Sequence, residues 1–284
     1  MSLIARGVLS IVLASLVAFP AGAQTRSDTP STPRIYIFDN GRLEVRDPRS
    51  FGFTRAELAE SSLILTSYLI VHPKGALMFD AGGIPDADFR GDGTPVTLDN
   101  MSASQPLLPQ LATIGYTPAE VTYFALSHYH ADHTANANAF AGSTWIVQKA
   151  EREAMFGGNP QDIIRPEYFS ALRNAGTRIL DNEDLDVFGD GTVVVKAAPG
   201  HTPGHQVLLV RPANHGPVLL AGDLYHYPEE RLTDRYPTFE FDVPRSRASR
   251  RMVEALLEET GAQLWIEHDI ATHAVLPTAP AYVD

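Results

Sequence analysis

Short apolar runs alternate with polar turns along most of the chain. Extended segments are predicted where such a run is bounded by Gly, Pro or Asp, at residues 35–38, 63–71, 76–79, 121–126, 145–148, 192–198, 206–210, 218–221 and 264–266. Helical segments are predicted between them, at residues 107–114, 135–140, 151–156 and 166–175. Strands mixed with helices in this way indicate an α/β protein whose sheets are covered by helices.

The strongest helical pattern lies near the C-terminus, at residues 246–260. Its apolar residues fall on one face, and Ser246 and Gly261 are residue types that favour the start and the end of a helix. On the same helix, three arginines are predicted to form a solvated basic face, namely Arg247, Arg250 and Arg251.

Two segments lack the periodicity of a helix or a strand. Residues 84–104 are rich in Gly, Asp and Pro, and they are predicted to form a long surface loop beside the functional site. Residues 236–241 are aromatic and are predicted to be a packed loop, with the wall of a pocket for an acyl chain as the alternative. Trp145 and Trp265 lie in apolar runs and are predicted to be in the core.

The first residues have the pattern of a secretory signal peptide. A basic residue precedes an apolar run, residues 8–19, that is followed by the small residues Ala21-Gly22-Ala23. The run is shorter than the roughly 20 residues that a membrane-spanning helix needs, and cleavage is expected before Gln24. Residues 1–23 are therefore predicted to be removed and residues 24–33 to be a flexible lead-in. The mature protein is expected to be exported, periplasmic or secreted, without membrane attachment.

The remaining chain, residues 34–284, is expected to form one domain because it has no repeat and no second linker. Its formal net charge of -12 excludes nucleic acid as a partner, since that backbone must be met by clustered Lys and Arg. A small, neutral substrate suits so acidic a chain, and a homodimer is compatible with the sequence. There is no cysteine, so that neither a disulfide nor a thiolate metal ligand can form.

Three histidines and an aspartate occupy one short segment, residues 127–133, directly after an apolar run. In extended chain His128 and His130 point the same way, while Asp132 and His133 turn into the start of a helix and can face a second point nearby. One ion cannot conveniently take all four side chains from so short a loop, but two adjacent ions can. Imidazole and carboxylate are groups that zinc and similar divalent ions accept. The segment therefore predicts a site for two metal ions.

Three further residues of these types follow other predicted strands. His201, Asp223 and His268 each come directly after a predicted strand. Strand ends converge on one edge of a sheet, where the sites of layered α/β proteins collect. We therefore expect these side chains to meet residues 127–133.

The pattern HxHxDH, a histidine in a GHTPGH loop, an aspartate in a GD step and a late histidine resembles that of the metallo-β-lactamase superfamily, from about residue 35 onwards. The resemblance implies a four-layer αββα sandwich with a dinuclear metal site at the edge of its sheets. It implies two divalent ions, with zinc expected, and seven ligands: His128, His130 and His201 for the first ion, Asp132, His133 and His268 for the second, and Asp223 as the bridge. Asp80 resembles the family's aspartate that orients a ligand histidine, and His205 is expected to be structural.

Such a site implies hydrolysis of an activated carbonyl group. Two divalent ions ~3.5–4 Å apart lower the pKa of a water molecule held between them, and the resulting hydroxide is the nucleophile. One ion also polarises the carbonyl oxygen of the substrate. Asp223 is expected to carry the proton to the leaving group. Asp132 is expected to be a second catalytic residue.

The substrate follows from the branch of the family that the sequence resembles. Metallo-β-lactamases proper usually replace the bridging aspartate, whereas the retained Asp223 and the overall pattern are most similar to N-acyl homoserine lactonases. The resemblance therefore implies the opening of neutral lactone rings. Lactonases of this type often carry a tyrosine three residues after the bridging aspartate, where this chain has His226; Tyr225 or His226 is expected to assist the carbonyl group instead.

Three alternatives stay open at this point. The same site could hydrolyse β-lactams, which the exported location favours and Asp223 disfavours. It could hydrolyse thioesters in the manner of glyoxalase II. A metal-dependent binding protein without turnover is the third, and it is disfavoured because every ligand position is filled.

Overall fold

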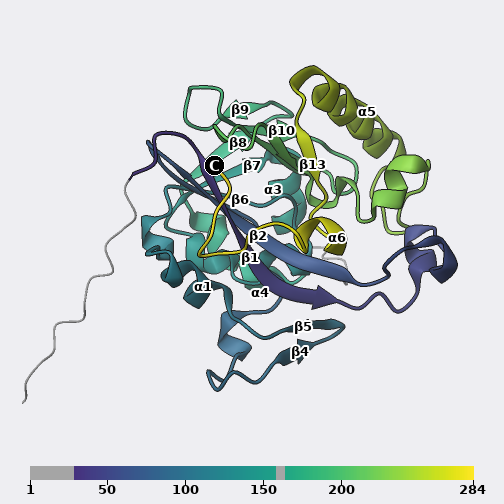
Figure 1. Ribbon diagram of the computed structural model, residues 1–284, viewed down its shortest axis with the longest axis horizontal. Helices are drawn as coiled ribbons and strands as arrows, with labels where there is room; N and C mark the ends of the chain where they lie inside the picture. Colours follow the sequence, from purple (N-terminus) through teal and green to yellow (C-terminus); the bar gives the residue numbers. More distant parts are fainter. Residues whose placement is uncertain (1–28, 158–163) are drawn as a thin grey trace, which may run out of the picture.

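The computed structural model describes residues 29–157 and 164–284, and its strands form two sheets (Figure 1). The predicted signal peptide, residues 1–23, lies outside these residues, as does the first half of the predicted lead-in. At the end of the lead-in, Pro30 and Pro33 are buried against the domain. Within the described ranges, no helix is long and apolar enough to cross a membrane.

The larger sheet has eight strands in the described part of the chain, in the order β4-β5-β1-β2-β3-β6-β7-β8. They are β1 (Arg34–Leu43), β2 (Leu63–His72), β3 (Gly75–Phe79), β4 (Val96–Leu98), β5 (Met101–Ala103), β6 (Tyr123–Ala125), β7 (Thr144–Gln148) and β8 (Thr177–Leu180). β1, β2 and β3 are antiparallel neighbours, whereas β3, β6, β7 and β8 run parallel. The carboxyl ends of these parallel strands therefore lie at the same edge.

The smaller sheet has five strands among the same residues, in the order β13-β12-β11-β10-β9. They are β9 (Leu185–Asp186), β10 (Val193–Ala197), β11 (Gln206–Val210), β12 (Val218–Leu220) and β13 (Gln263–Trp265). Only β12 and β13 pair in parallel, and the long connection between them contains α5 (Val243–Thr260).

Three apolar clusters separate four layers. The first lies between the two sheets, where Ile70 of β2 packs in one cluster with Leu208 of β11. The next residue along β2, Leu69, belongs to a second cluster with the helices that cover the larger sheet. The third cluster joins Leu209 of β11 to Val253 of α5, which lies outside the smaller sheet in Figure 1. Adjacent strand residues therefore face opposite sides of a sheet, and the fold is the αββα sandwich that the family resemblance implied.

The other helices are short. They are α1 (Leu107–Thr113), α2 (Ala131–Thr134), α3 (Lys149–Phe156), α4 (Pro166–Phe169) and α6 (Ile270–His273). The predicted helix at 135–140 is not an α-helix, because residues 135–136 form a turn and residues 137–140 a 3-10 helix. The predicted helix at 166–175 is only partly α-helical, because residues 170–174 form a 3-10 helix. Trp145 and Trp265 are buried, as predicted.

The predicted surface loop at residues 84–104 is partly wrong, because it contains the small hairpin of β4 and β5. The two strands pair across a turn in which Asp99 has a left-handed φ of 55°. Met101 and Ala103 of β5 are buried with Leu65 and Ile84, so that the packing of one face holds this short hairpin on the sheet.

The predicted start of the long helix α5 is wrong. The helix begins at Val243 rather than at Ser246, because the side chain of Asp242 accepts a hydrogen bond from the backbone N–H of Arg245. Ser246 is buried inside the first turns instead. The predicted end is confirmed, since Gly261 has a φ of 67° and donates to the carbonyl of Leu257.

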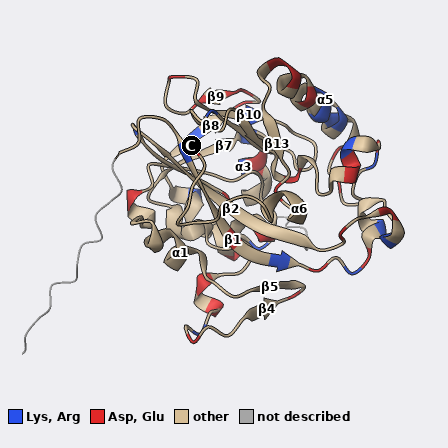
Figure 2. Cartoon of the chain, in the orientation of Figure 1, with Lys and Arg blue, Asp and Glu red and all other residues tan. Residues whose placement is uncertain are grey.

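The predicted basic face of α5 is also only partly correct. In Figure 2 the basic residues of α5 lie in its first half and the acidic residues in its second half. Arg247 is exposed and pairs with Asp234. Arg250 is buried: it donates to the carbonyl of Leu224 at 2.9 Å and pairs with the buried Glu230. The charge of Arg250 is therefore neutralised by a buried ion pair and does not contribute to a basic surface.

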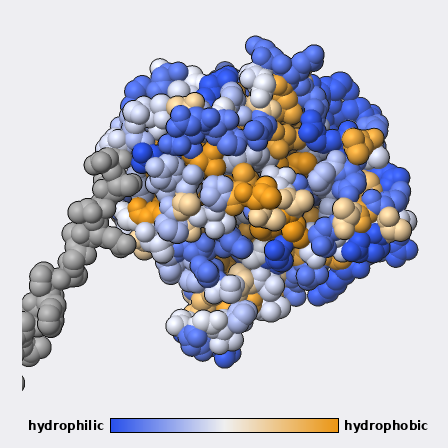
Figure 3. Space-filling view, in the orientation of Figure 1, coloured by the Kyte–Doolittle hydropathy of each residue, from blue (hydrophilic) through white to orange (hydrophobic). Residues whose placement is uncertain are grey.

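The outer surface is mostly hydrophilic on the face shown in Figure 3, with smaller apolar areas among the polar residues. In the aromatic segment 236–241, Phe239 is 36% exposed and Phe241 is 51% exposed. The prediction of a packed loop is therefore wrong for these two side chains, and Phe239 borders the site described next.

Candidate metal centre

The predicted ligands lie at one edge of the sandwich, beyond the ends of strands from both sheets. β6 of the larger sheet leads into the segment that begins with His128. β10, β12 and β13 of the smaller sheet lead into His201, Asp223 and His268 respectively. The structure brings all seven predicted ligands together in two adjoining groups.

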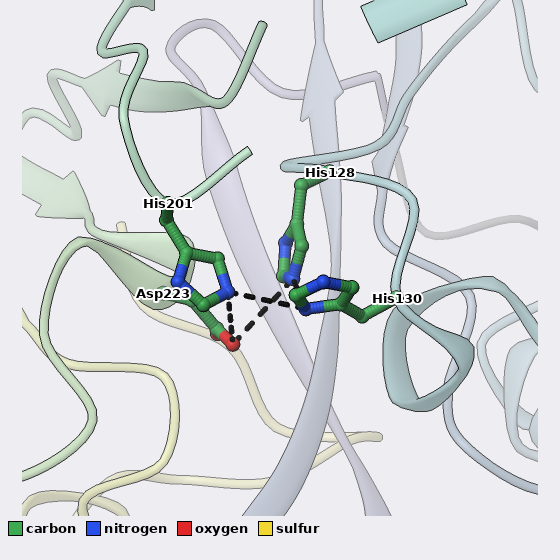
Figure 4. A group of neighbouring side chains, drawn as sticks. All are labelled: His128, His130, His201 and Asp223. Atoms are coloured by element: carbon green, nitrogen blue, oxygen red, sulfur yellow. Dashed lines mark hydrogen bonds and ion pairs between the residues drawn. The ribbon is translucent and has the colours of Figure 1, made fainter. Parts of the chain in front are cut away.

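The first group consists of His128, His130, His201 and Asp223 (Figure 4), whose ligand atoms all lie within 4.8 Å of one another. Nε2 of His128 and Nε2 of His201 lie 2.8 and 3.1 Å from Nδ1 of His130. Figure 4 shows the three rings pointing toward one carboxylate oxygen of Asp223, which is 3.5 Å from His128 and 3.4 Å from His201. Three imidazoles and a carboxylate are a suitable set for one tetrahedral metal ion.

The second group consists of Asp132, His133, Asp223 and His268, again within 4.8 Å of one another. Oδ1 of Asp223 lies 3.1 Å from Nε2 of His133 and 3.0 Å from Nε2 of His268. Oδ2 of Asp132 lies 3.6 and 3.7 Å from the same two nitrogens. Asp132 is the one member of this group that is not fully buried, so it faces the entrance of the site.

Asp223 belongs to both groups, and each of its oxygens faces a different one. Oδ2 faces His128 and His201, whereas Oδ1 faces His133 and His268. The side chain is buried, so that its charge is little screened by solvent. This arrangement is that of a carboxylate placed to bridge two ions.

The donor atoms fit a pair of divalent cations. Nε2 of His133, Nε2 of His268 and Oδ1 of Asp223 are buried, and they have no hydrogen-bond partner among the described residues. Burial and the neighbouring His133 hold the pKa of His128 well below its usual value, which keeps its imidazole neutral, as a metal ligand must be. Zinc, iron, cobalt and manganese all accept such a set of nitrogen and oxygen ligands.

The second ring nitrogen of a ligand histidine has a partner of its own. Nδ1 of His133 lies 3.2 Å from Asp80, which also accepts a 2.6 Å hydrogen bond from the backbone N–H of Ser127. Nδ1 of His268 donates to the carbonyl of Ile64 at 2.8 Å. Such partners turn Nε2 of each ring toward the metal and raise its basicity. Asp80 therefore lies where the resemblance placed it.

Sequence reasoning missed two glutamates that support ligand histidines. Glu240 lies 3.0 Å from Nδ1 of His201, and Glu267 lies 3.3 Å from Nδ1 of His133. Burial, reinforced by the nearby charge of Asp80, raises the pKa of Glu267 to about 8. Glu267 is the residue before a predicted ligand, a signal that could have been used, whereas nothing in the sequence links residue 240 to the site.

Of the two residues expected to assist the carbonyl group, only His226 lies at the site. Its Nε2 is 3.2 Å from Oδ2 of Asp223, and its Nδ1 is 3.3 Å from the buried Glu230. The hydroxyl of Tyr225 instead donates to Glu254 at 2.9 Å, and its ring packs in the core beneath α5. Because Tyr225 has extended backbone, its side chain and that of the next residue point to opposite sides. The expected role for Tyr225 is therefore wrong.

A small cavity of about 110 Å³ opens beside the two ligand groups. Its walls combine the ligand side chains and His226 with four apolar residues, Leu43, Phe51, Leu63 and Phe239. The rings of Phe51 and Phe239 meet edge to face with their centroids 5.4 Å apart. Polar groups at one end and an apolar wall at the other suit a small uncharged substrate with an apolar part.

Two groups of potential metal ligands that share one carboxylate, at the edge of an αββα sandwich, are typical of a metal-binding protein. The chain belongs to the metallo-beta-lactamase superfamily, whose family model matches residues 63–260. It is 31% identical to the N-acyl homoserine lactonase AttM of Azorhizobium caulinodans, over 88% of this chain and 98% of that protein. An N-acyl homoserine lactonase from a Bacillus species is 29% identical over the same shares of the two chains.

Solved structures show the same fold. A quorum-quenching N-acyl homoserine lactone lactonase superposes with a TM-score of 0.72 at 24% identity, over 90% of this chain and all of that one. AidC, a dizinc quorum-quenching lactonase, superposes with a TM-score of 0.63 at 19% identity, over 84% of this chain and 88% of that one.

Proposed function

We propose that the protein is a metal-dependent lactonase whose substrates are N-acyl homoserine lactones. The observation that carries this proposal is the position of Asp223, with one carboxylate oxygen in each of two complete ligand groups. The relatives at about 30% identity that span nearly the whole chain support the substrate class. The cavity supports it as well, because it is small and has an apolar wall.

The site would hold two divalent ions, which we propose to be zinc. His128, His130, His201 and Asp223 would hold the first, and Asp132, His133, Asp223 and His268 the second. When bound, such a pair lowers the pKa of water and polarises a carbonyl group. In the net reaction the oxygen of water bonds to the lactone carbonyl carbon, the ring C–O bond breaks, and a proton reaches the departing ring oxygen.

Residues of the chain would transfer that proton and position the substrate. Asp223 lies between the two groups and can accept a proton from the attacking water and then deliver it to the ring oxygen. His226, fixed between Asp223 and Glu230 on the cavity wall, would place Nε2 near the substrate carbonyl group. Leu43, Phe51 and Phe239 would keep bulk water away from the reacting atoms.

An assay panel tests the reaction class. Purified, zinc-loaded protein is offered a homoserine lactone series, a chromogenic β-lactam and a thioester, and proton release is followed at low buffer strength. We expect turnover of the lactones, loss of that turnover on chelation and recovery when zinc is returned. Preferred turnover of the β-lactam or the thioester would contradict the proposal, as would full activity of the metal-free protein.

We also propose that the protein acts outside the cytoplasm, which the signal-peptide pattern of residues 1–23 supports. Cell fractionation and N-terminal sequencing test this. We expect the mature chain in the exported fraction, beginning at Gln24. An intact N-terminus in the cytoplasmic fraction would contradict it.

A further inference from the structure

A buried carboxylate outside both ligand groups links the two loops that supply the histidines of the first group. Glu151 belongs to α3 and is 2% exposed. Its Oε1 accepts a hydrogen bond from the backbone N–H of Tyr129 at 2.9 Å. Its Oε2 accepts one from the backbone N–H of Gly204 at 2.8 Å. The hydroxyl of Thr202 lies 2.9 and 2.8 Å from the two oxygens.

The groups that donate hydrogen bonds to Glu151 lie close to metal ligands in the sequence. Tyr129 stands between the ligands His128 and His130, and Thr202 directly follows the ligand His201. One carboxylate therefore connects the two loops: Tyr129 and Thr202 are each adjacent to a ligand, and Gly204 is three residues beyond His201. Neither ligand group includes Glu151 itself, and its contacts are with backbone N–H groups and the Thr202 hydroxyl of the two loops.

The packing leaves no freedom at this connection. A Cβ atom on Gly204 would lie 2.5 Å from the backbone nitrogen of Glu151, so that only glycine allows α3 to approach the loop so closely. Thr202 is also fully buried. Burial raises the pKa of Glu151 to about 7, while the three donors favour its ionised form.

We propose that Glu151 is a positioning residue that sets the distance between the two loops and thereby the metal affinity of the first ligand group. The proposal rests on the metal centre of the proposed function. An amide at this position would turn one acceptor oxygen into an NH₂ group that faces a donor, so that the connection is lost without a change of shape. A donor facing a donor would move the loop of His201 away from that of His128.

The second ligand group provides the internal reference. His133 is supported by Asp80, and His268 by the carbonyl of Ile64, and neither support involves Glu151. Loss of the Glu151 connection should therefore lower the affinity for the first metal ion and leave the affinity for the second unchanged. A general loss of stability would weaken both.

The experiment measures the affinity of each ion in Glu151→Gln, with cobalt in place of zinc so that each ion has an absorption band. His201→Ala and His268→Ala, each lacking a ligand of one group, assign the bands to the two groups. We expect the first ion to bind roughly 10–100-fold more weakly and the second to be unchanged, since partners of metal ligands have effects of this size. Glu153→Gln is the matched control, because Glu153 lies on the same helix and is exposed.

A second pair of variants keeps the test decisive if Glu151→Gln does not fold. Thr202→Val removes one donor and leaves the carboxylate in place, and Thr202→Ser restores the hydroxyl. We expect Thr202→Val to weaken the first ion and Thr202→Ser to recover it. Equal weakening of both ions, or no change in either, would overturn the role of Glu151. Because metal affinity is measured without substrate, absence of lactone hydrolysis would contradict the proposed function and leave this inference standing.

Discussion

Nε2 of His205 accepts a hydrogen bond from the backbone N–H of Asp223 at 3.0 Å. Nδ1 of the same ring lies 3.1 Å from the carbonyl of Ala198, to which it donates. Burial, assisted by the nearby His201, lowers the pKa of His205 to about 3, so that the ring is neutral and its tautomer is fixed by these two contacts. The residue expected to be structural therefore holds the backbone of the bridging carboxylate.

Replacement of His205 by Phe should remove that support while keeping a ring in the same space. The buried N–H of Asp223 would lose its acceptor, which costs about 1–3 kcal/mol of the free energy of unfolding. We also expect weaker binding of both metal ions, because Asp223 serves both groups. Urea unfolding of the metal-free protein and metal titration measure the two effects. His215→Phe is the control, since His215 lies on a partly exposed loop; an equal loss in both variants would contradict the assignment.

Replacement of Asp223 by Ala should abolish most of the activity. We expect turnover of a homoserine lactone to fall by more than about 100-fold, because both the shared ligand and the proton carrier are lost. The fold should persist, since the side chain contributes to none of the three apolar clusters that separate the layers. Circular dichroism checks the fold and a lactonase assay checks the rate. Near-normal turnover in the folded variant would rule out the bridging role.

His226 and Tyr225 form a matched pair for testing the carbonyl-assisting group. His226→Ala should lower kcat on a homoserine lactone by roughly 10- to 100-fold with both ions still bound, since His226 belongs to neither ligand group. Tyr225→Phe should leave kcat almost unchanged, because its hydroxyl donates to Glu254 away from the cavity. Steady-state kinetics with metal analysis of both proteins separates the two. A larger loss in Tyr225→Phe would reverse the assignment.

The layers of the fold could be predicted because the long inner strands are apolar on both faces. β2 and β11 are buried throughout; β11 is apolar from Val207 to Val210, and β2 has apolar residues on either side of Thr66 and Ser67. β8 could not be found in this way, because it lies at the edge of the sheet and exposes Arg178 and Ile179. The hairpin of β4 and β5 is fixed by packing on Leu65, a contact between segments that no local pattern contains.

The ligands could be predicted because each follows a strand, and strand ends meet at one edge. The groups that orient them could not, since Glu240 and Glu151 come from a loop and a helix whose approach to the site is set by tertiary packing. The choice between Tyr225 and His226 also needed the structure. Two adjacent residues face opposite sides of an extended backbone, and only the fold decides which side is the site.

The buried His273 should make the free energy of unfolding depend on pH. Its Nε2 lies 3.2 Å from the hydroxyl of Tyr68, and burial lowers its pKa to about 4 although Asp269 opposes the shift. The folded state therefore disfavours the protonated ring, whereas the unfolded chain takes up the proton near pH 6.5. The stability that the neutral ring contributes is fully present above pH 6.5 and is lost as the pH falls toward 4.

Replacement of His273 by Gln, which keeps an acceptor for Tyr68, isolates this contribution. A pKa difference of about 2.5 between the two states corresponds to on the order of 3 kcal/mol of unfolding free energy at 1.36 kcal/mol per unit. The wild-type protein should therefore lose stability relative to the variant as the pH falls from 7 to 4. Urea unfolding of both metal-free proteins across this range measures the difference, and both proteins carry the same set of metal ligands. A difference that stays constant with pH would show that His273 has the same pKa in the folded and unfolded states. That result would contradict the prediction that burial against Tyr68 lowers the pKa of the folded state.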